Sequence, residues 1–161
     1  LRVYHNAMMI AEMEGQGEEE VIALSALLHD CDDHKLFHTE NNANARSFLQ
    51  EEGLSEGRME EICRNINSVS FSKNRGKVPE TIEGKIVQDA DRLEAIGAIG
   101  IARCFQFGGS HGRSVENSIE HFYEKLLLIS KELSTPSARK MAEKRDKLMQ
   151  DFLKEWGEEM N

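Results

Sequence analysis

The sequence has few prolines and cysteines and no long hydrophobic run. Two of its 161 residues are proline, whereas Ala, Leu, Glu, Met and Lys are abundant, and this composition favours helix throughout the chain. No apolar run approaches the roughly 18 residues that are needed to span a bilayer. We therefore expect an all-α protein with no membrane partner.

Cysteine is too widely spaced to suggest a metal or disulfide scaffold. Cys31, Cys63 and Cys104 show no C-x-x-C spacing, which argues against a zinc knuckle and against a disulfide framework. Reduced thiols are the simplest interpretation, and they are typical of a cytoplasmic protein. No secretory signal peptide is visible, although the sequence begins at Leu1 rather than at Met. We expect a cytoplasmic location.

Positive charge is in the minority. The chain has 20 Lys and Arg residues and 29 Asp and Glu residues, which gives a net charge of -9. A duplex nucleic-acid binder needs a basic face, so this balance argues against that class. It leaves open a phosphorylated small molecule held by a metal and a few local cations. The length suffices for a substantial core, and we predict a single domain over 1–161.

The stretch 26–33 carries the first sign of chemistry. An apolar helix face that ends at Leu28 is followed directly by His29 and Asp30. Ionisable groups beside a core need a partner, and a divalent metal is one such partner. Imidazole with carboxylate suits Mn, Fe, Co, Ni or Zn better than Ca, which prefers oxygen ligands. The alternative is a plain helix C-terminus, where the helix dipole favours a His.

A second pair of acidic residues within an apolar stretch strengthens the hypothesis of a metal site. Asp89 and Asp91 lie within an otherwise apolar, helix-like run over 85–93. Two such intrusions in one small chain are harder to explain as ordinary surface residues than one.

Hydrophobic spacing predicts six or seven helices and no sheet of consequence. The expected ranges are 1–14, 18–29, 41–52, 55–68, 82–107, 116–133 and 135–158. The helix over 82–107 is apolar on more than one side, so we expect it to form the centre of the core. Gly97 and Gly100 within it are expected to allow a neighbouring helix to approach closely, and Gly108 and Gly109 are expected to end it.

Two loops contain residues that suit a ligand. His34 and His38 are four apart in 32–40, which would suit a metal pair if that loop were helical, but a solvated loop is favoured. Lys73 and Arg75 alternate with neutral residues in the loop over 70–81 and are able to approach a phosphate. A solvated loop is again the more common explanation.

With these residues in place, the chain resembles the HD-domain superfamily of metal-dependent phosphohydrolases. His29 and Asp30 resemble the signature dipeptide, and Ala90 to Leu93 resembles the segment with the last Asp of the signature. The strings 83–103 and 121–126 are similar to the subgroup of small stand-alone bacterial HD hydrolases. The resemblance covers essentially the whole chain and implies an HD-domain helical bundle.

The sequence departs from this pattern in two places. The first His of the family signature falls upstream of Leu1, outside the printed sequence, so we expect a segment there that carries it. The subgroup usually has a His at the position of Val69. If that His contacts substrate or a second metal, this protein lacks the contact.

The resemblance also implies roles for individual residues. His29, Asp30 and Asp91 would ligate a divalent metal (Mn, Fe, Co, Ni, Zn or Mg), with Asp89 as the alternative to Asp91, because acids two apart on a helix do not face one ion. Asp33 would act as general base or acid. Candidates to hold phosphate complete the set: Lys125, Arg92, Arg103, Lys73 and Arg75. An ion pair with Asp89 or Glu94 is an equal alternative for Arg92.

The implied function is hydrolysis of a nucleotide or nucleotide-like phosphate by metal-activated water. A monoester, a pyrophosphate and a cyclic diester remain equally open as the bond that is cut. The alternative is a sensing module that binds metal or nucleotide with little turnover. We expect a monomer or a homodimer.

Overall fold

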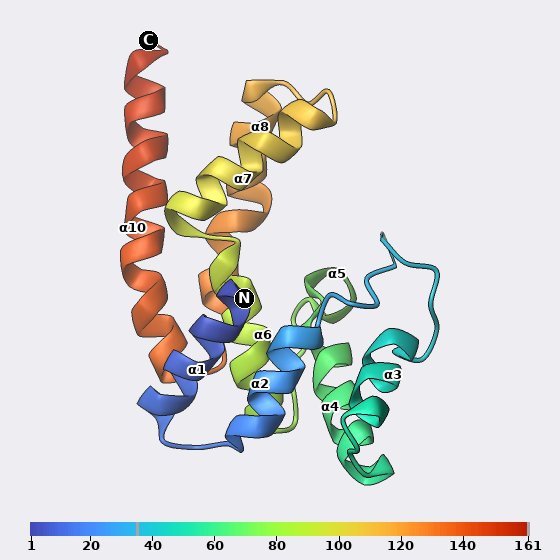
Figure 1. Cartoon of the computed structure of the whole chain (residues 1–161). Helices are drawn as coiled ribbons and strands as arrows, with labels where there is room; N and C mark the ends of the chain where they lie inside the picture. The colour runs from blue at the N-terminus through green and yellow to red at the C-terminus, as the bar shows by residue number, and fades with distance from the viewer. Residues whose placement is uncertain (35, 161) are drawn as a thin grey trace. The chain divides into compact units, whose positions relative to one another are not determined.

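The computed structural model describes residues 1–34 and 36–160, and all regular structure in that part of the chain is helical (Figure 1). The all-α prediction is confirmed. The longer helices are α1 (Arg2–Glu14), α2 (Glu19–Leu28), α3 (Ala43–Glu51), α4 (Glu56–Val69), α6 (Ile82–Glu94), α7 (Gly97–Ser110), α8 (Val115–His121) and α10 (Pro136–Glu159). The shorter elements are α5 (Phe71–Asn74), the π-helix η1 (Phe122–Leu126), α9 (Leu127–Ile129) and the 3-10 helix η2 (Ser130–Glu132). None of the described helices is long and apolar enough to traverse a membrane.

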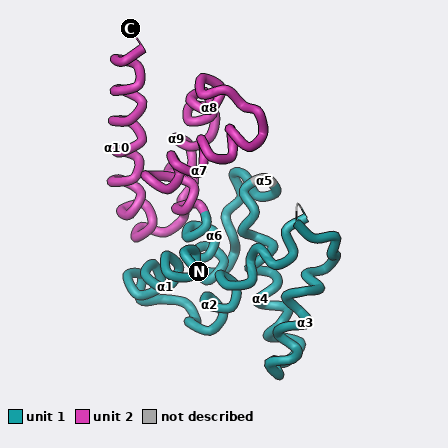
Figure 2. Tube along the Cα trace, turned by 45° about the horizontal axis from the view of Figure 1, so that its top comes forward, with its two compact units in different colours: residues 1–91 teal, residues 92–161 magenta. Residues whose placement is uncertain are grey.

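The chain forms two compact units, residues 1–91 and residues 92–161 (Figure 2). The division falls inside α6, so that Asp91 is the last residue of the first unit and Arg92 is the first residue of the second. A single domain over 1–161 stays a prediction.

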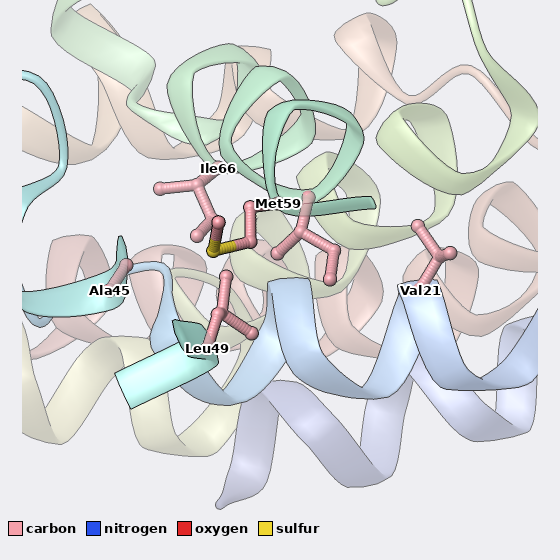
Figure 3. Packing of buried hydrophobic residues seen from close by; sticks show 6 residues of the cluster. Val21, Ala45, Leu49, Met59 and Ile66 are labelled. Carbon is pink, nitrogen blue, oxygen red and sulfur yellow. The ribbon is translucent and has the colours of Figure 1, made fainter. Parts of the chain in front are cut away.

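One hydrophobic cluster of the first unit is built by α2, α3 and α4 (Figure 3). The buried side chains of this cluster are Val21 from α2, Ala45 and Leu49 from α3, and Met59, Ile62 and Ile66 from α4. Burying an aliphatic side chain of this size contributes roughly 1.5–3 kcal/mol. Leu24 and Leu28 of α2 pack against the same cluster. The core therefore fixes the C-terminal turn of α2, which leads directly into His29.

One long helix over 82–107 is a wrong prediction. α6 ends at Glu94, and α7 begins at Gly97, whose φ of 75° breaks the helix. A side chain at Gly97 would be strained at this φ, and its Cβ would lie 3.0 Å from Cβ of Arg145 in α10. The expected close approach of another helix is therefore confirmed at Gly97. At Gly100, an added Cβ would instead meet the carbonyl of Ala95, so the crowding there comes from the preceding turn.

The helix stop at Gly108 and Gly109 is also a wrong prediction. α7 continues through both residues to Ser110. A Cβ on Gly108 would lie 2.5 Å from Oγ of Ser118, so Gly108 allows α8 to pack closely on α7. The chain turns afterwards, at Gly112, which has a φ of 69°.

The region 116–133 is helical, as predicted, but it is not one uniform α-helix. It consists of α8, the π-turn η1, α9 and η2 in direct succession. The loop over 70–81 contains the unpredicted short helix α5. Two other helices have side-chain caps: Ser55 accepts a hydrogen bond from the amide of Arg58, and Thr135 accepts one from the amide of Ala138.

Candidate metal centre

His29 is placed and oriented by the last turn of α2. Ser25 and Ala26 lie on the buried face of this helix, and His29 follows its last residue, Leu28. The Nδ1 atom of His29 lies 2.8 Å from the carbonyl oxygen of Ala26, and a carbonyl only accepts, so Nδ1 donates. The imidazole is 11% exposed. Its orientation is therefore set by the backbone, and Nε2 is the atom left for chemistry.

Two carboxylates approach this Nε2 atom. It lies 3.1 Å from Oδ2 of Asp30 and 3.7 Å from Oδ1 of Asp91. Ligand atoms about 2.1 Å from one ion are separated by about 3.0 Å at octahedral angles and about 3.4 Å at tetrahedral angles. The separations observed here are close to those values. Among the described residues, no group of three His, Cys, Asp or Glu side chains closes into a complete metal-holding set.

The electrostatics of His29 show that its surroundings favour a cation. Burial acts to lower the pKa of His29, but the hydrogen bond and charge of Asp30, with the charge of Asp91, raise it overall. Without a metal, the proton of an imidazolium satisfies these acids. The same arrangement is suitable for a divalent ion, because neutral imidazole and two carboxylates are the donors that such ions use.

Asp91 and Asp89 have different environments although both lie on α6. Asp91 has a side chain that is 32% exposed and is the one near His29. Asp89 is fully buried. Residues two apart on a helix are separated by about 200° around its axis, which explains the difference. Of the two acids that the sequence left open, the geometry favours Asp91 as the ligand.

Asp33 lies in the turn that follows Asp30. Its amide donates to the carbonyl of Asp30 at 3.1 Å, and its side chain is 28% exposed. Oδ1 of Asp33 is 3.3 Å from Nδ1 of His34. His34 and His38 are both exposed, as the solvated-loop interpretation expects.

A family profile described as HD domain matches residues 1–96, a range that contains His29, Asp30, Asp33 and Asp91. This match covers more than half of the chain. The chain belongs to the HD-domain family.

Relatives of this HD domain have the same fold. YpgQ of Bacillus subtilis (strain 168), an uncharacterised protein, is 35% identical over 94% of this chain and 81% of its own. The crystal structure of B. subtilis YpgQ in complex with ADP superimposes with a TM-score of 0.84 at 33% identity, over 98% of this chain and 85% of that one. An HD-superfamily hydrolase from Bacillus thuringiensis gives a TM-score of 0.82 at 36% identity, over 99% of this chain and 83% of that one. The chain is thus a member of a hydrolase superfamily.

The candidate phosphate-binding cations of this HD domain are divided between the two units. Lys73 and Arg75 belong to the first unit, where Lys73 is exposed at the end of α5 and the guanidinium of Arg75 lies 5.9 Å from the ring centre of Phe71. Arg103 is exposed on α7 in the second unit, and Lys125 is partly buried in the π-turn η1. Single π-turns are often found at functional sites.

Arg92 differs from the other candidate cations because its side chain is only 1% exposed. Its Nη1 donates to the carbonyl of Glu132 at 2.6 Å, and its Nη2 lies 3.4 Å from the Glu132 carboxylate. Glu132 of η2 is thus one partner of Arg92. The ion pair of Arg92 with Asp89 or Glu94 stays a prediction. This geometry anchors the end of α6 within the second unit.

Sequence reasoning missed the role of Asp32. It treated 32–40 as a plain polar loop, but the Asp32 carboxylate accepts hydrogen bonds from Thr39, Asn44 and Ala45 at the start of α3. No local pattern in the sequence shows this role, because the amides that Asp32 binds lie 12 and 13 residues later. Val69, at the end of α4, is 2% exposed and contributes to the hydrophobic interior.

Proposed function

We propose that this HD domain is a divalent-metal-dependent phosphohydrolase that acts on a nucleotide or nucleotide-like phosphate. The observation that carries the proposal is the approach of Asp30 and Asp91 to Nε2 of His29, at 3.1 and 3.7 Å. The crystal structure of YpgQ with ADP supports a nucleotide as the ligand class.

His29, Asp30 and Asp91 would hold the metal, which would take the place of a proton on Nε2. The HD signature contains a further His ligand. The donor set fits Mn, Fe, Co, Ni, Zn or Mg. When bound, such an ion lowers the pKa of a water ligand and polarises a phosphoryl oxygen.

Asp33 is the candidate general base or acid. The Asp33 amide closes the turn by donating to the carbonyl of Asp30. The Asp33 carboxylate would accept the proton of the attacking water and later supply a proton to the leaving oxygen. The partial exposure of Asp33 leaves it able to exchange that proton with solvent.

Local cations would offset the repulsion between an anionic substrate and a chain of net charge -9. Lys73, Arg75, Arg103 and Lys125 are the candidates whose side chains are exposed or partly exposed. Arg92 is the least suitable candidate, because its guanidinium is buried against Glu132.

The test is metal analysis of the full-length protein together with turnover on a panel of nucleoside mono-, di- and triphosphates, in an assay that distinguishes phosphate from pyrophosphate. Asp91→Asn is compared with Asp151→Asn, the same substitution at an exposed acid on α10 that pairs with Lys147. We expect Asp91→Asn to lose metal and turnover together, while Asp151→Asn keeps both. Wild-type protein without turnover on any substrate would contradict the proposal.

A metal- or nucleotide-binding sensing module is the second candidate. Buried Val69, at a position where the small bacterial subgroup usually has a His, favours it because a substrate or metal contact would be absent. Stoichiometric metal and nucleotide binding without hydrolysis in the same experiment would select this function.

A further inference from the structure

Asp32 lies between Asp30 and Asp33, yet its carboxylate is bound to a different part of the chain. Its Oδ1 accepts from the Thr39 hydroxyl at 2.6 Å and from the Asn44 amide at 3.1 Å. Its Oδ2 accepts from the Ala45 amide at 3.0 Å. These three bonds join the acidic turn to residues 7 to 13 positions later.

The beginning of α3 explains why an acid is needed there. Asn42, the N-cap, has a φ of 57° and its side chain makes no capping hydrogen bond. The Ala43 amide donates to the Glu40 carbonyl, which leaves the next two amides to be satisfied by Asp32. A carboxylate at this place is also favoured by the positive end of the helix dipole. Asp32 therefore caps α3 from a distance.

The capped helix is itself fixed by the core. Ala45 and Leu49 of α3 are fully buried in the cluster with α2 and α4 (Figure 3). A second bond strengthens the link, because the Asn44 side chain donates to the Cys31 carbonyl at 2.8 Å. α3 therefore contacts the backbone of Cys31 and the side chain of Asp32, which are the two residues between Asp30 and Asp33.

We propose that Asp32 is a positioning residue that holds the turn from Asp30 to Asp33 in register with His29, and that it neither ligates metal nor transfers protons. The inference rests on the proposed function, since it gives Asp32 a purpose only if Asp30 and Asp33 act on a metal and its water. Asp30 needs such support because its own side chain is 71% exposed.

The test compares Asp32→Asn, Thr39→Val, their double variant and a control in the full-length protein. Ser47→Gly is the control, because it loosens exposed α3 surface without contacting Asp32. Three readouts are taken: kcat and KM on the best nucleotide of the panel, the affinity for Mn²⁺ alone by calorimetry, and hydrogen exchange of the Asn44 and Ala45 amides without metal.

We expect Asp32→Asn to accelerate exchange at both amides and to lower kcat by about 10- to 100-fold, with KM changed much less. Thr39→Val should lower kcat by a smaller factor, and the double variant should be no worse than Asp32→Asn alone, because both substitutions break one link. Ser47→Gly should leave kcat and Mn²⁺ affinity unchanged.

Faster exchange in Asp32→Asn with wild-type kcat and wild-type Mn²⁺ affinity would overturn the inference, since Asp32 would then be a helix cap only. A wild-type protein without turnover would overturn the proposed function separately. In that case the Mn²⁺ affinity decides: a several-fold loss in Asp32→Asn supports positioning, and an unchanged affinity overturns it.

Discussion

The two acidic stretches of the candidate site differ in how their geometry arises. Asp89 and Asp91 lie on a regular helix, so their two-residue spacing alone places them on different sides of α6. Asp30, Asp32 and Asp33 lie in a turn, where spacing sets no direction. One of them is beside His29, one caps α3, and one contacts His34. Counting therefore shows that the two helical acids face different sides, whereas acids in a turn can be distinguished only by their contacts.

The largest effect is expected at the helical acids and tests whether counting sorts them correctly. Asp91→Ala should abolish stoichiometric metal and lower turnover by more than about a thousandfold, because a ligand carboxylate is lost. Asp89→Asn should keep the metal but lower the free energy of unfolding by about 1–3 kcal/mol, since it alters a fully buried polar group. Elemental analysis and denaturant unfolding of both variants check this. The reverse result, with metal lost from Asp89→Asn only, would exchange the two roles.

The next effect concerns the acids of the turn. Asp33→Asn should lower kcat by about 100- to 1,000-fold while the metal content stays at the wild-type level, because Asp33 is proposed to move a proton and not to hold the ion. Asp30→Asn should lose metal instead. Metal content and kcat measured on the same two preparations separate these outcomes. Asp33→Asn protein that purifies without metal would show that the turn holds the ion through Asp33.

The same contrast explains how much could be predicted from the sequence. The expected ranges 55–68 and 135–158 agree with α4 and α10 to within one residue at each end. Failures occurred where a single backbone angle or a distant partner decides the outcome. Hydrophobic spacing predicted one helix through Gly97, but the positive φ of Gly97 breaks it.

Distant partners also determine the environments of individual site residues. Glu132 follows Arg92 by 40 positions, and the amide of Ala45 follows Asp32 by 13. No local spacing rule connects such pairs. The family resemblance implies the catalytic roles of His29, Asp30, Asp91 and Asp33, and the contacts of these residues determine which variants test those roles.

A smaller effect should separate structural from substrate-binding cations. Arg92→Ala should lower the free energy of unfolding by about 2–4 kcal/mol, because it removes a buried guanidinium from the Glu132 carbonyl and carboxylate. Lys73→Ala, at an exposed position of α5, should leave stability unchanged and raise KM by about three- to tenfold. Chemical denaturation and steady-state kinetics of both variants provide the measurement. A stable Arg92→Ala protein with a raised KM would return Arg92 to the substrate site.

The smallest effect is a pH dependence at His121, the last residue of α8, whose charged neighbours come both from the helical run and from the turn before it. Burial lowers the pKa of His121 below its ordinary value of 6.5, and the charges of Arg113 and Lys125 lower it further. Because the pKa of His121 is lower in the folded than in the unfolded chain, protonation favours unfolding. The stability that neutral His121 provides is therefore complete above about pH 6.5 and is lost as the pH falls below that value. His121→Gln should flatten the decline in melting temperature between pH 7 and pH 5.5. Lys125→Gln should flatten it partly, because a repelling charge four residues away is removed. Identical pH profiles for His121→Gln and wild-type protein would show that the decline comes from other groups, and that counting along a helix is a less reliable guide to its electrostatics than to its packing.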